Sequence, residues 1–236
     1  MIKEVFETEG INCITYRSEG QPEYLLIQAV DDHDIEVLES EFCKIAEGVS
    51  SPVLLAAFKV RDWNEDLSPW QAPPVFGNVP FGGKAGETLN FVKGQFIPCI
   101  KERYELGDEV PVIIGGYSLA GLFALWTALE KSGFAAAAAA SPSVWFPGWA
   151  EYVTERAKEG IKTPAVYLSL GDKEDRTRNQ VMKKVRDNLE LTKDILSGSG
   201  VSCEAEYNPG NHFRDPDLRT ARAFIWCILE QEAKDE

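Results

Sequence analysis

Histidine, methionine and long hydrophobic runs are scarce in this chain of 236 residues. It has two histidines, His33 and His212, and two methionines. No apolar run reaches the ~18 residues that a membrane-spanning helix needs, so we expect no membrane span. The chain does not open with a basic segment followed by an apolar one, so we also expect no signal peptide.

Positive charge is in short supply as well. The chain carries 24 Lys and Arg against 38 Asp and Glu, a net charge of −14. This charge repels phosphate, which argues against nucleic-acid partners and against docking on an anionic membrane. With 44% hydrophobic and 26% charged residues, the composition is that of a globular protein rather than a disordered, collagen-like or coiled-coil one.

Cysteine occurs only as scattered single residues. The five cysteines are odd in number and form no Cys-x-x-Cys pair. This usage favours buried thiols in a reducing cytoplasm over a disulfide or zinc framework, so we expect a cytoplasmic location. Asp31-Asp32-His33-Asp34 could suggest a metal site, but Asp34 is better explained as the N-cap of a helix beginning at Ile35. We expect no metal.

Strand-like and helix-like segments alternate along the chain. We expect a hairpin from residues 2–8 and 11–18, followed by strands at 24–30, 52–60, 110–115, 135–140, 165–170 and 203–208. We expect helices at 35–46, 84–105, 119–131, 176–196 and 216–232. This alternation predicts a mostly parallel sheet covered by helices on both faces, with the N-terminal hairpin antiparallel.

The chain has room for one domain, 1–236, without a large cap. Residues 61–82 form a long irregular stretch that contains four prolines. A loop of that length in a compact domain is usually functional. It is the candidate for a lid or substrate loop.

Ser118 stands in the strongest catalytic motif. The apolar segment 111–115 leads into Gly116-Tyr117-Ser118-Leu119-Ala120-Gly121, and a helical pattern follows. A strand, a sharp turn with small residues and then a helix are the context of a nucleophile elbow. Gly48-Val49-Ser50 lacks that context. We therefore predict that Ser118 is the nucleophile.

A serine nucleophile needs a base and an acid, which follow it in the order serine, acid, histidine in α/β-hydrolases. His212, directly after the last predicted strand, is the histidine that comes after Ser118. The loop after strand 165–170 offers Asp172, Glu174 and Asp175. We choose Glu174 as the acid and keep the two aspartates as alternatives; Asp175 could instead cap the following helix.

Four segments together resemble the putative-esterase family of α/β-hydrolases, which includes esterase D-like and enterochelin esterase-like proteins. They are Gly116–Leu125, Ser141-Pro142-Ser143-Val144-Trp145, Leu168–Glu174 and Gly210–Phe213. The resemblance extends over roughly residues 20–232. It implies a serine hydrolase of esters with an α/β-hydrolase fold, in which Ser118, Glu174 and His212 are catalytic. It also implies that the enzyme uses no metal and no organic cofactor.

The chain departs from the family pattern at two places. Ala120 stands where the family usually has Gly, so its methyl group must fit against the neighbouring strand. The His-Gly pair common after the third strand is replaced by Gln28-Ala29-Val30-Asp31. An oxyanion hole uses backbone N–H donors, so we expect one from Leu119 and the other from Val30 or Asp31.

Aromatic residues cluster in two loops that follow predicted strands. Four tryptophans lie there: Trp63, Trp70, Trp145 and Trp149. Loops after parallel strands share one rim of the sheet with Ser118. We therefore predict that Trp63, Trp70 and Trp145, with Tyr117, bind an apolar or planar part of the substrate; ordinary packing explains the tryptophans equally well.

These residues predict a hydrolase of small-molecule carboxylic esters that acts through an acyl-enzyme. The same residues could pass the acyl group to another alcohol, which makes an acyltransferase the nearest alternative. A second alternative is a non-catalytic hydrolase-fold protein that binds a ligand in the tryptophan-lined cleft.

Overall fold

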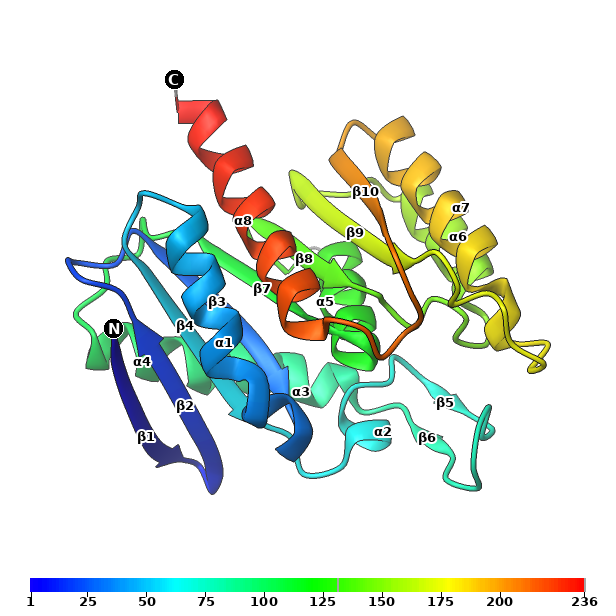
Figure 1. The fold of residues 1–236 in the computed structure, drawn as a ribbon, viewed down its shortest axis with the longest axis horizontal. Helices are drawn as coiled ribbons and strands as arrows, with labels where there is room; N and C mark the ends of the chain where they lie inside the picture. Colours follow the sequence, from blue (N-terminus) through cyan, green and yellow to red (C-terminus); the bar gives the residue numbers. More distant parts are fainter. Residues whose placement is uncertain (131, 236) are drawn as a thin grey trace.

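A central sheet of eight strands organises the chain (Figure 1). The computed structural model describes residues 1–130 and 132–235. The strand order is β1-β2-β4-β3-β7-β8-β9-β10. The β1–β2 hairpin and the β2–β4 pair are antiparallel, and the remaining neighbours are parallel. The strands of this sheet are β1 (Ile2–Thr8), β2 (Ile11–Arg17), β3 (Tyr24–Val30), β4 (Val53–Lys59), β7 (Val112–Tyr117), β8 (Ala136–Ala140), β9 (Ala165–Gly171) and β10 (Ser202–Asn208).

Helices cover both faces of the sheet, as the sequence predicts. Two of them, α1 (Asp32–Gly48) and α8 (Pro216–Asp235), lie side by side on the face turned to the viewer in Figure 1. Those that cover the opposite face are α3 (Ala85–Phe91), α4 (Ile97–Arg103), α5 (Ser118–Leu129), α6 (Trp149–Lys158) and α7 (Val185–Gly198). No helix among residues 1–130 and 132–235 is both long enough and apolar enough to cross a bilayer.

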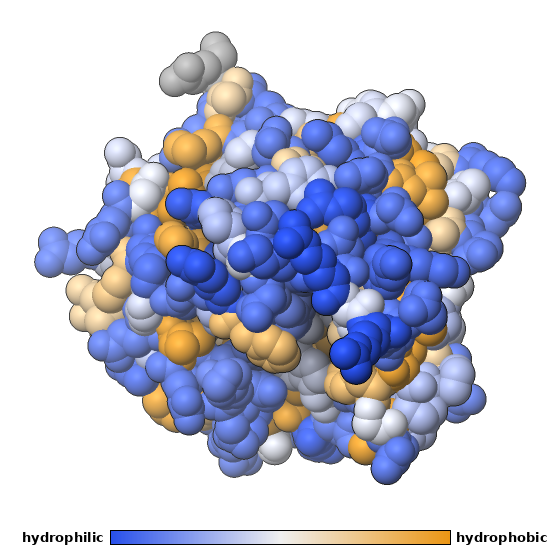
Figure 2. Space-filling model, turned by 45° about the vertical axis from the view of Figure 1, so that its right-hand side comes forward, coloured by the Kyte–Doolittle hydropathy of each residue, from blue (hydrophilic) through white to orange (hydrophobic). Residues whose placement is uncertain are grey.

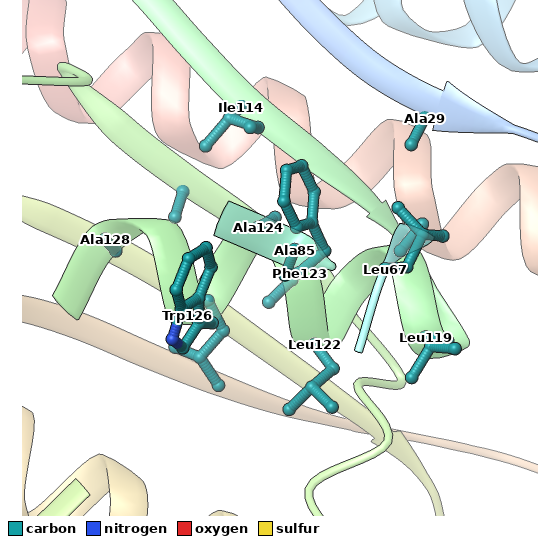
Figure 3. Close-up of a cluster of buried hydrophobic side chains, with 14 of the residues drawn as sticks. Ala29, Leu67, Ala85, Ile114, Leu119, Leu122, Phe123, Ala124, Trp126 and Ala128 are labelled. Atoms are coloured by element: carbon teal, nitrogen blue, oxygen red, sulfur yellow. The ribbon is translucent and has the colours of Figure 1, made fainter. Parts of the chain in front are cut away.

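Helix α5 forms the centre of the larger core. All of its residues from Leu119 to Leu129 are buried. Figure 3 shows Leu119, Leu122 and Phe123 of this helix beneath Ile114 of β7 and Ala29 of β3. A helix that is apolar on every side has to be enclosed by other elements. The junction between β7 and α5, where Ser118 lies, is therefore held by packing along the whole helix.

Strand β8 consists of alanine, and its side chains point in alternation to the two faces. Ala137 and Ala139 contact the core beneath α5, whereas Ala136, Ala138 and Ala140 contact the core beneath α1 and α8. Alanine favours helix by propensity, but this short run pairs with β7 on one side and with β9 on the other. The predicted buried strand is confirmed.

Segment 61–82 is more ordered than predicted. It contains α2 (Trp63–Asp66) and the two-stranded β5 (Gln71–Ala72) and β6 (Phe81–Gly82). The predicted helix 84–105 is divided by η1 (Val92–Phe96), a stretch of π-helix just before Pro98. Proline lacks an N–H and its ring displaces the preceding carbonyls, which accounts for the wider turn.

Three further predictions on helices are corrected by the structure. Helix α1 begins at Asp32 rather than Ile35, because Asp31, not Asp34, accepts the free N–H groups of the first turn. Helix α7 begins at Val185 rather than 176, after η2 (Met182–Lys184), because residues 172–181 fold as turns. Helix α6 was not predicted: it follows Pro147-Gly148, and its short amphipathic run is easily taken for loop.

A carboxyl group is buried between β3 and α1. The side chain of Glu41 is 3% exposed, and its Oε2 lies 3.5 Å from Nε2 of Gln28, while its Oε1 has no partner among the described residues. Burial raises the pKa of Glu41 well above its ordinary value. Burial therefore favours the neutral form of this carboxyl in the folded protein.

We expect Glu41→Gln to stabilise the protein at neutral pH by about 1–3 kcal/mol, because an amide keeps the shape and removes the cost of burying an acid. The folded pKa is raised, so the wild type loses stability as the pH rises above the pKa of an unfolded Glu, and the variant does not. Urea unfolding at about pH 5 and about pH 8 measures this difference, which should be larger at the higher pH.

The exposed Glu47 lies on the same helix and provides the matched control. Glu47→Gln should leave the free energy of unfolding nearly unchanged at both pH values. An advantage of Glu41→Gln that does not grow with pH would contradict a neutral buried carboxyl.

Candidate active site

Ser118 is held in a strained turn between β7 and α5. Its φ of 59° lies in the left-handed region, which side chains other than glycine rarely adopt. The chain passes so closely here that a Cβ on Gly116 would lie 2.7 Å from Cβ of Ala120, and one on Gly121 would lie 2.8 Å from the carbonyl oxygen of Ala140. The missing side chain of Gly116 is thus what makes room for Ala120 in place of the usual glycine.

The structure brings Ser118, His212 and Glu174 together in hydrogen-bond contact. Nε2 of His212 lies 2.9 Å from Oγ of Ser118. On the other side of the ring, Nδ1 of His212 lies 2.7 Å from Oε2 of Glu174. The three residues come from the β7–α5 turn, the loop after β10 and the loop after β9. A histidine so placed can accept the serine proton through Nε2 while the carboxylate fixes its orientation through Nδ1.

The second carboxylate oxygen of Glu174, Oε1, has three hydrogen-bond donors. Oε1 of Glu174 accepts hydrogen bonds from the N–H of Gly171 at 2.6 Å, the hydroxyl of Ser141 at 2.9 Å and Nη1 of Arg219 at 3.0 Å. The Glu174 side chain is 4% exposed and that of Arg219 is 1% exposed. Because three donors hold Oε1, Oε2 remains directed at His212.

Arg219 was not foreseen from the sequence. Besides Glu174, its guanidinium donates to the hydroxyl of Tyr117 at 3.2 Å and to the carbonyl oxygen of Asn211 at 3.1 Å. It lies on the buried side of α8, four residues before Ala223 and eight before Cys227. A charged residue in register with a buried helical stripe is the signal that could have identified it.

The two alternative acids have other partners. Oδ1 of Asp172 accepts from the N–H of Gly210 at 2.8 Å, so it ties the loop after β9 to the loop after β10. Oδ2 of Asp175 lies 3.2 Å from Nε of Arg186. Neither aspartate is in hydrogen-bond contact with His212 in the described part of the chain, which favours Glu174 over both.

A cleft of about 380 Å³ opens beside the three residues. Ser118, Glu174 and His212 form its polar side. Its other lining residues are apolar: Phe76, Trp145, Met182, Val185 and Phe213. Phe213 is 86% exposed and Phe76 is 53% exposed, so two aromatic rings stand at the mouth of the cleft. The cleft suits an apolar or planar group next to the serine.

Trp145 is the predicted substrate tryptophan that lines this cleft. Phe76, from the predicted substrate loop 61–82, packs edge-on against it with ring centroids 5.8 Å apart. Phe76 escaped prediction because a single aromatic in a proline-rich loop carries no pattern. The sequence also carries no pattern that marks Met182, Val185 or Phe213 as lining residues.

The other three predicted substrate residues have structural contacts. The hydroxyl of Tyr117 donates to the carbonyl oxygen of His212 at 2.6 Å, so it anchors the loop that carries the base. Nε1 of Trp70 donates to the carbonyl oxygen of Pro147 at 2.9 Å, and Trp63 packs partly buried against the core. None of the three is among the described residues that line the cleft.

The residues predicted to supply the backbone N–H donors of the oxyanion hole lie in two places, at the start of α5 and at the end of β3. Leu119 follows Ser118 in the first turn of α5, where backbone N–H groups have no helical partner. The N–H of Asp31 donates to Oδ2 of Asp34 at 3.2 Å, in the cap of α1. Val30, at the end of β3, is 1% exposed. Of the two expected second donors, Asp31 is thus engaged in the helix cap, and neither Val30 nor Asp31 is among the described residues that line the cleft.

The other histidine, His33, lies outside the group formed by Ser118, His212 and Glu174. The side chain of His33 is 87% exposed, on the first turn of α1, 4.0 Å from Glu36. Across the described residues, no three side chains of His, Cys, Asp and Glu come together in a way that could hold a metal ion.

Comparison with known proteins identifies the family. A family model described as "Putative esterase" matches residues 14–214. No curated protein sequence matches the chain significantly. Among solved structures, the siderophore hydrolase EstB from Aspergillus nidulans is similar, with a TM-score of 0.74 and 16% identity over 95% of this chain and 93% of that one.

Two bacterial structures show the same likeness. The IroE-like serine hydrolase from Shewanella oneidensis has a TM-score of 0.74 and 17% identity, over 95% of this chain and 78% of that one. The BES protein from Bacillus cereus has a TM-score of 0.71 and 18% identity, over 96% of this chain and 95% of that one. The predicted α/β-hydrolase fold is thereby confirmed, and because the family match spans most of the sequence, the chain belongs to the putative-esterase family.

Proposed function

We propose that the protein hydrolyses carboxylic esters of small molecules through a covalent acyl-enzyme on Ser118. The observation that carries this proposal is the pair of contacts through His212, 2.9 Å to Ser118 Oγ and 2.7 Å to Glu174 Oε2. Membership of an esterase family supports the reaction class. The same contacts weigh against a non-catalytic binding protein, since such a protein has no need of them.

Acylation begins when Nε2 of His212 takes the proton of Ser118 and Oγ attacks the ester carbonyl. The oxygen of the tetrahedral intermediate becomes negative, and backbone N–H groups of Leu119 and Val30 are the donors that we assign to it. Glu174 stabilises the imidazolium through Nδ1. His212 then passes its proton to the departing alcohol, which leaves the acyl group bound to Ser118 as an ester.

Deacylation repeats these steps with water in place of the serine. His212 takes a proton from water, the resulting hydroxide attacks the acyl carbon, and Ser118 recovers its proton as the acid leaves. The Tyr117 bond to the His212 carbonyl keeps the imidazole in place through both halves. An acyltransferase would differ only in accepting an alcohol instead of water, so product analysis with and without added alcohol separates the two activities.

The substrate proposal follows from the cleft. Its aromatic and aliphatic walls favour an ester with an apolar or planar part. Several similar structures are named for siderophore or enterobactin ester hydrolysis, including the enterobactin esterase from Shigella flexneri, with a TM-score of 0.66 and 15% identity over 97% of this chain and 59% of that one. Esters of this kind, with graded chromogenic acyl esters, form the first substrate panel.

We expect Ser118→Ala to abolish both ester turnover and labelling by a fluorophosphonate probe, because the attacking oxygen is gone. The loss in kcat should be about 10⁴-fold or more. Ser143 supplies the matched control, since its Oγ lies 3.4 Å from Oγ of Ser118 in the same site. Ser143→Ala should still be labelled; labelling that persists in Ser118→Ala would sink the assignment of the nucleophile.

We expect Glu174→Gln to lower kcat about 10³- to 10⁴-fold, because an amide can donate to Nδ1 and so select the wrong histidine tautomer. Asp172→Asn and Asp175→Asn should each cost less than about tenfold, because their carboxylates bind Gly210 and Arg186 instead. Initial rates on a chromogenic ester give the comparison. If Asp172→Asn is the most damaging of the three, Glu174 is not the acid.

We expect His212→Ala to lose several powers of ten in kcat, because general-base catalysis fails in both acylation and deacylation. His33→Ala should keep most of the activity, since the exposed His33 ring has Glu36 as its charged neighbour and contacts no residue of the site in the described part of the chain. Kinetics should be paired with thermal unfolding curves. A folded but inactive His33→Ala protein would show that the loop after β3 takes part in the chemistry.

A further inference from the structure

Positive charge is concentrated in one segment of this acidic protein. Residues 173–186 contain six Lys or Arg and two Asp or Glu, a net charge of +4. The rest of the chain therefore carries a net charge of −18, and the two parts together give the total of −14. The two carboxylates within the segment are already bound: Glu174 contacts Arg219, and Asp175 contacts Arg186. The remaining charge of the segment is free to act on something else.

The cations of this segment are exposed. Lys173, Arg176, Arg178, Lys183 and Lys184 are all on the surface. None of the five forms an ion pair with a residue in 1–130 or 132–235. Elsewhere the usual arrangement is different: Lys44 contacts Asp217 at 2.7 Å, and Arg103 contacts Glu4 at 2.8 Å. We call these five side chains the basic rim.

Three members of the basic rim are sequence neighbours of residues that line the cleft: Lys173 precedes Glu174, and Lys183 and Lys184 lie between Met182 and Val185. Met182 and Val185, which flank Lys183 and Lys184 in sequence, line the cleft itself. Lys184 also lines an adjoining hollow of about 370 Å³ that shares Trp145 with the cleft. Nδ2 of Asn179 donates to the carbonyl oxygen of Val75 at 2.6 Å, which joins this segment to the loop of Phe76.

The surface view agrees with this placement. Figure 2 turns the right-hand side of the molecule forward, where the segment between β9 and α7 lies. That view shows dark-blue hydrophilic side chains and orange hydrophobic surface close to one another on this side of the molecule.

We propose that the basic rim binds an anionic group of the ester substrate, while the aromatic cleft holds its apolar part and presents the ester carbonyl to Ser118. The substrate class is thus an amphiphilic ester whose far end carries a carboxylate or a phosphate. This inference rests on the proposed ester hydrolysis and adds the charge of the substrate to it.

The net charge of the whole protein has the opposite sign to that of the basic rim. A net charge of −14 repels anions at long range, so without a local positive site an anionic ester would be turned over less well than a neutral one. Screening acts over about 10 Å at 0.1 M salt, so cations at the cleft mouth dominate once the substrate is close. Free lysine and arginine side chains are the donors that carboxylate and phosphate oxygens prefer.

The first test compares two 4-nitrophenyl esters of equal chain length, the neutral valerate and the anionic hemiglutarate. The measured quantity is the ratio of their kcat/KM values, anionic over neutral. In the double variants Lys183→Gln/Lys184→Gln and Arg176→Gln/Arg178→Gln this ratio should fall about 3- to 10-fold each. A ratio that stays within about 1.5-fold of wild type in both variants overturns the proposal.

A matched control uses two exposed cations that lie away from the cleft. Lys93 is in η1. Lys162 precedes the amino end of β9, whereas the site lies beyond the carboxyl ends of the strands. Lys93→Gln/Lys162→Gln makes the same change in net charge and should leave the ratio unaltered. An equal fall in the ratio in this control would mean that net charge alone is responsible, which also overturns the proposal.

The sign of the salt effect provides a second test on the wild-type protein. With the basic rim engaged, raising the ionic strength from ~0.01 M to ~0.15 M should lower kcat/KM for the hemiglutarate, because screening weakens an attraction. If the overall negative charge governs the encounter, salt should raise that value instead, and the proposal fails. The neutral valerate reports ester hydrolysis itself, so failure of the proposed function is seen separately, as loss of turnover on both esters.

Discussion

The active site depends on one buried ion pair, between Arg219 and Glu174. Removing a guanidinium from water is costly unless its donors are all satisfied. Here Arg219 donates to the acid, to the hydroxyls of Tyr117 and Ser141, and to carbonyl oxygens of the loop that carries His212. The same side chain thus joins the ends of β7, β8, β9 and β10. The relative placement of Ser118, Glu174 and His212 follows from the need of Arg219 for hydrogen-bond partners.

Around this ion pair, packing supplies the rigidity that catalysis requires. The strained backbone of Ser118 costs on the order of 1–3 kcal/mol, and such a conformation persists only where the surroundings determine it. Here the buried residues of α5 and of β7, on either side of Ser118, determine its conformation. A serine in an unstrained turn would not project from the strand end at the same angle.

Sequence reasoning located the parts of the site that are fixed by local order along the chain. The strand–turn–helix pattern identified Ser118, and the order of the chain identified His212. The sequence favoured Glu174 but left Asp172 and Asp175 as alternatives, because that choice depends on how the loop after β9 turns. Arg219 and Phe76 reach the site through tertiary packing, from α8 and from the loop 61–82, and neither has a pattern of its own. The start of α7 was wrong for the same reason, since Asn179 binds Val75 in place of continuing a helix.

Strand β8 sets the thickness of the molecule at the point where the site is built. Its alanines present single methyl groups to α5 on one face and to α8 on the other. Small residues let helices approach a sheet more closely than large ones. Helix α5 begins with Ser118, and α8 carries Arg219, whose guanidinium holds Glu174. The alanine strand is therefore a spacer between the helix that begins with Ser118 and the helix that carries Arg219, and a larger side chain within it would push α5 or α8 away from the sheet.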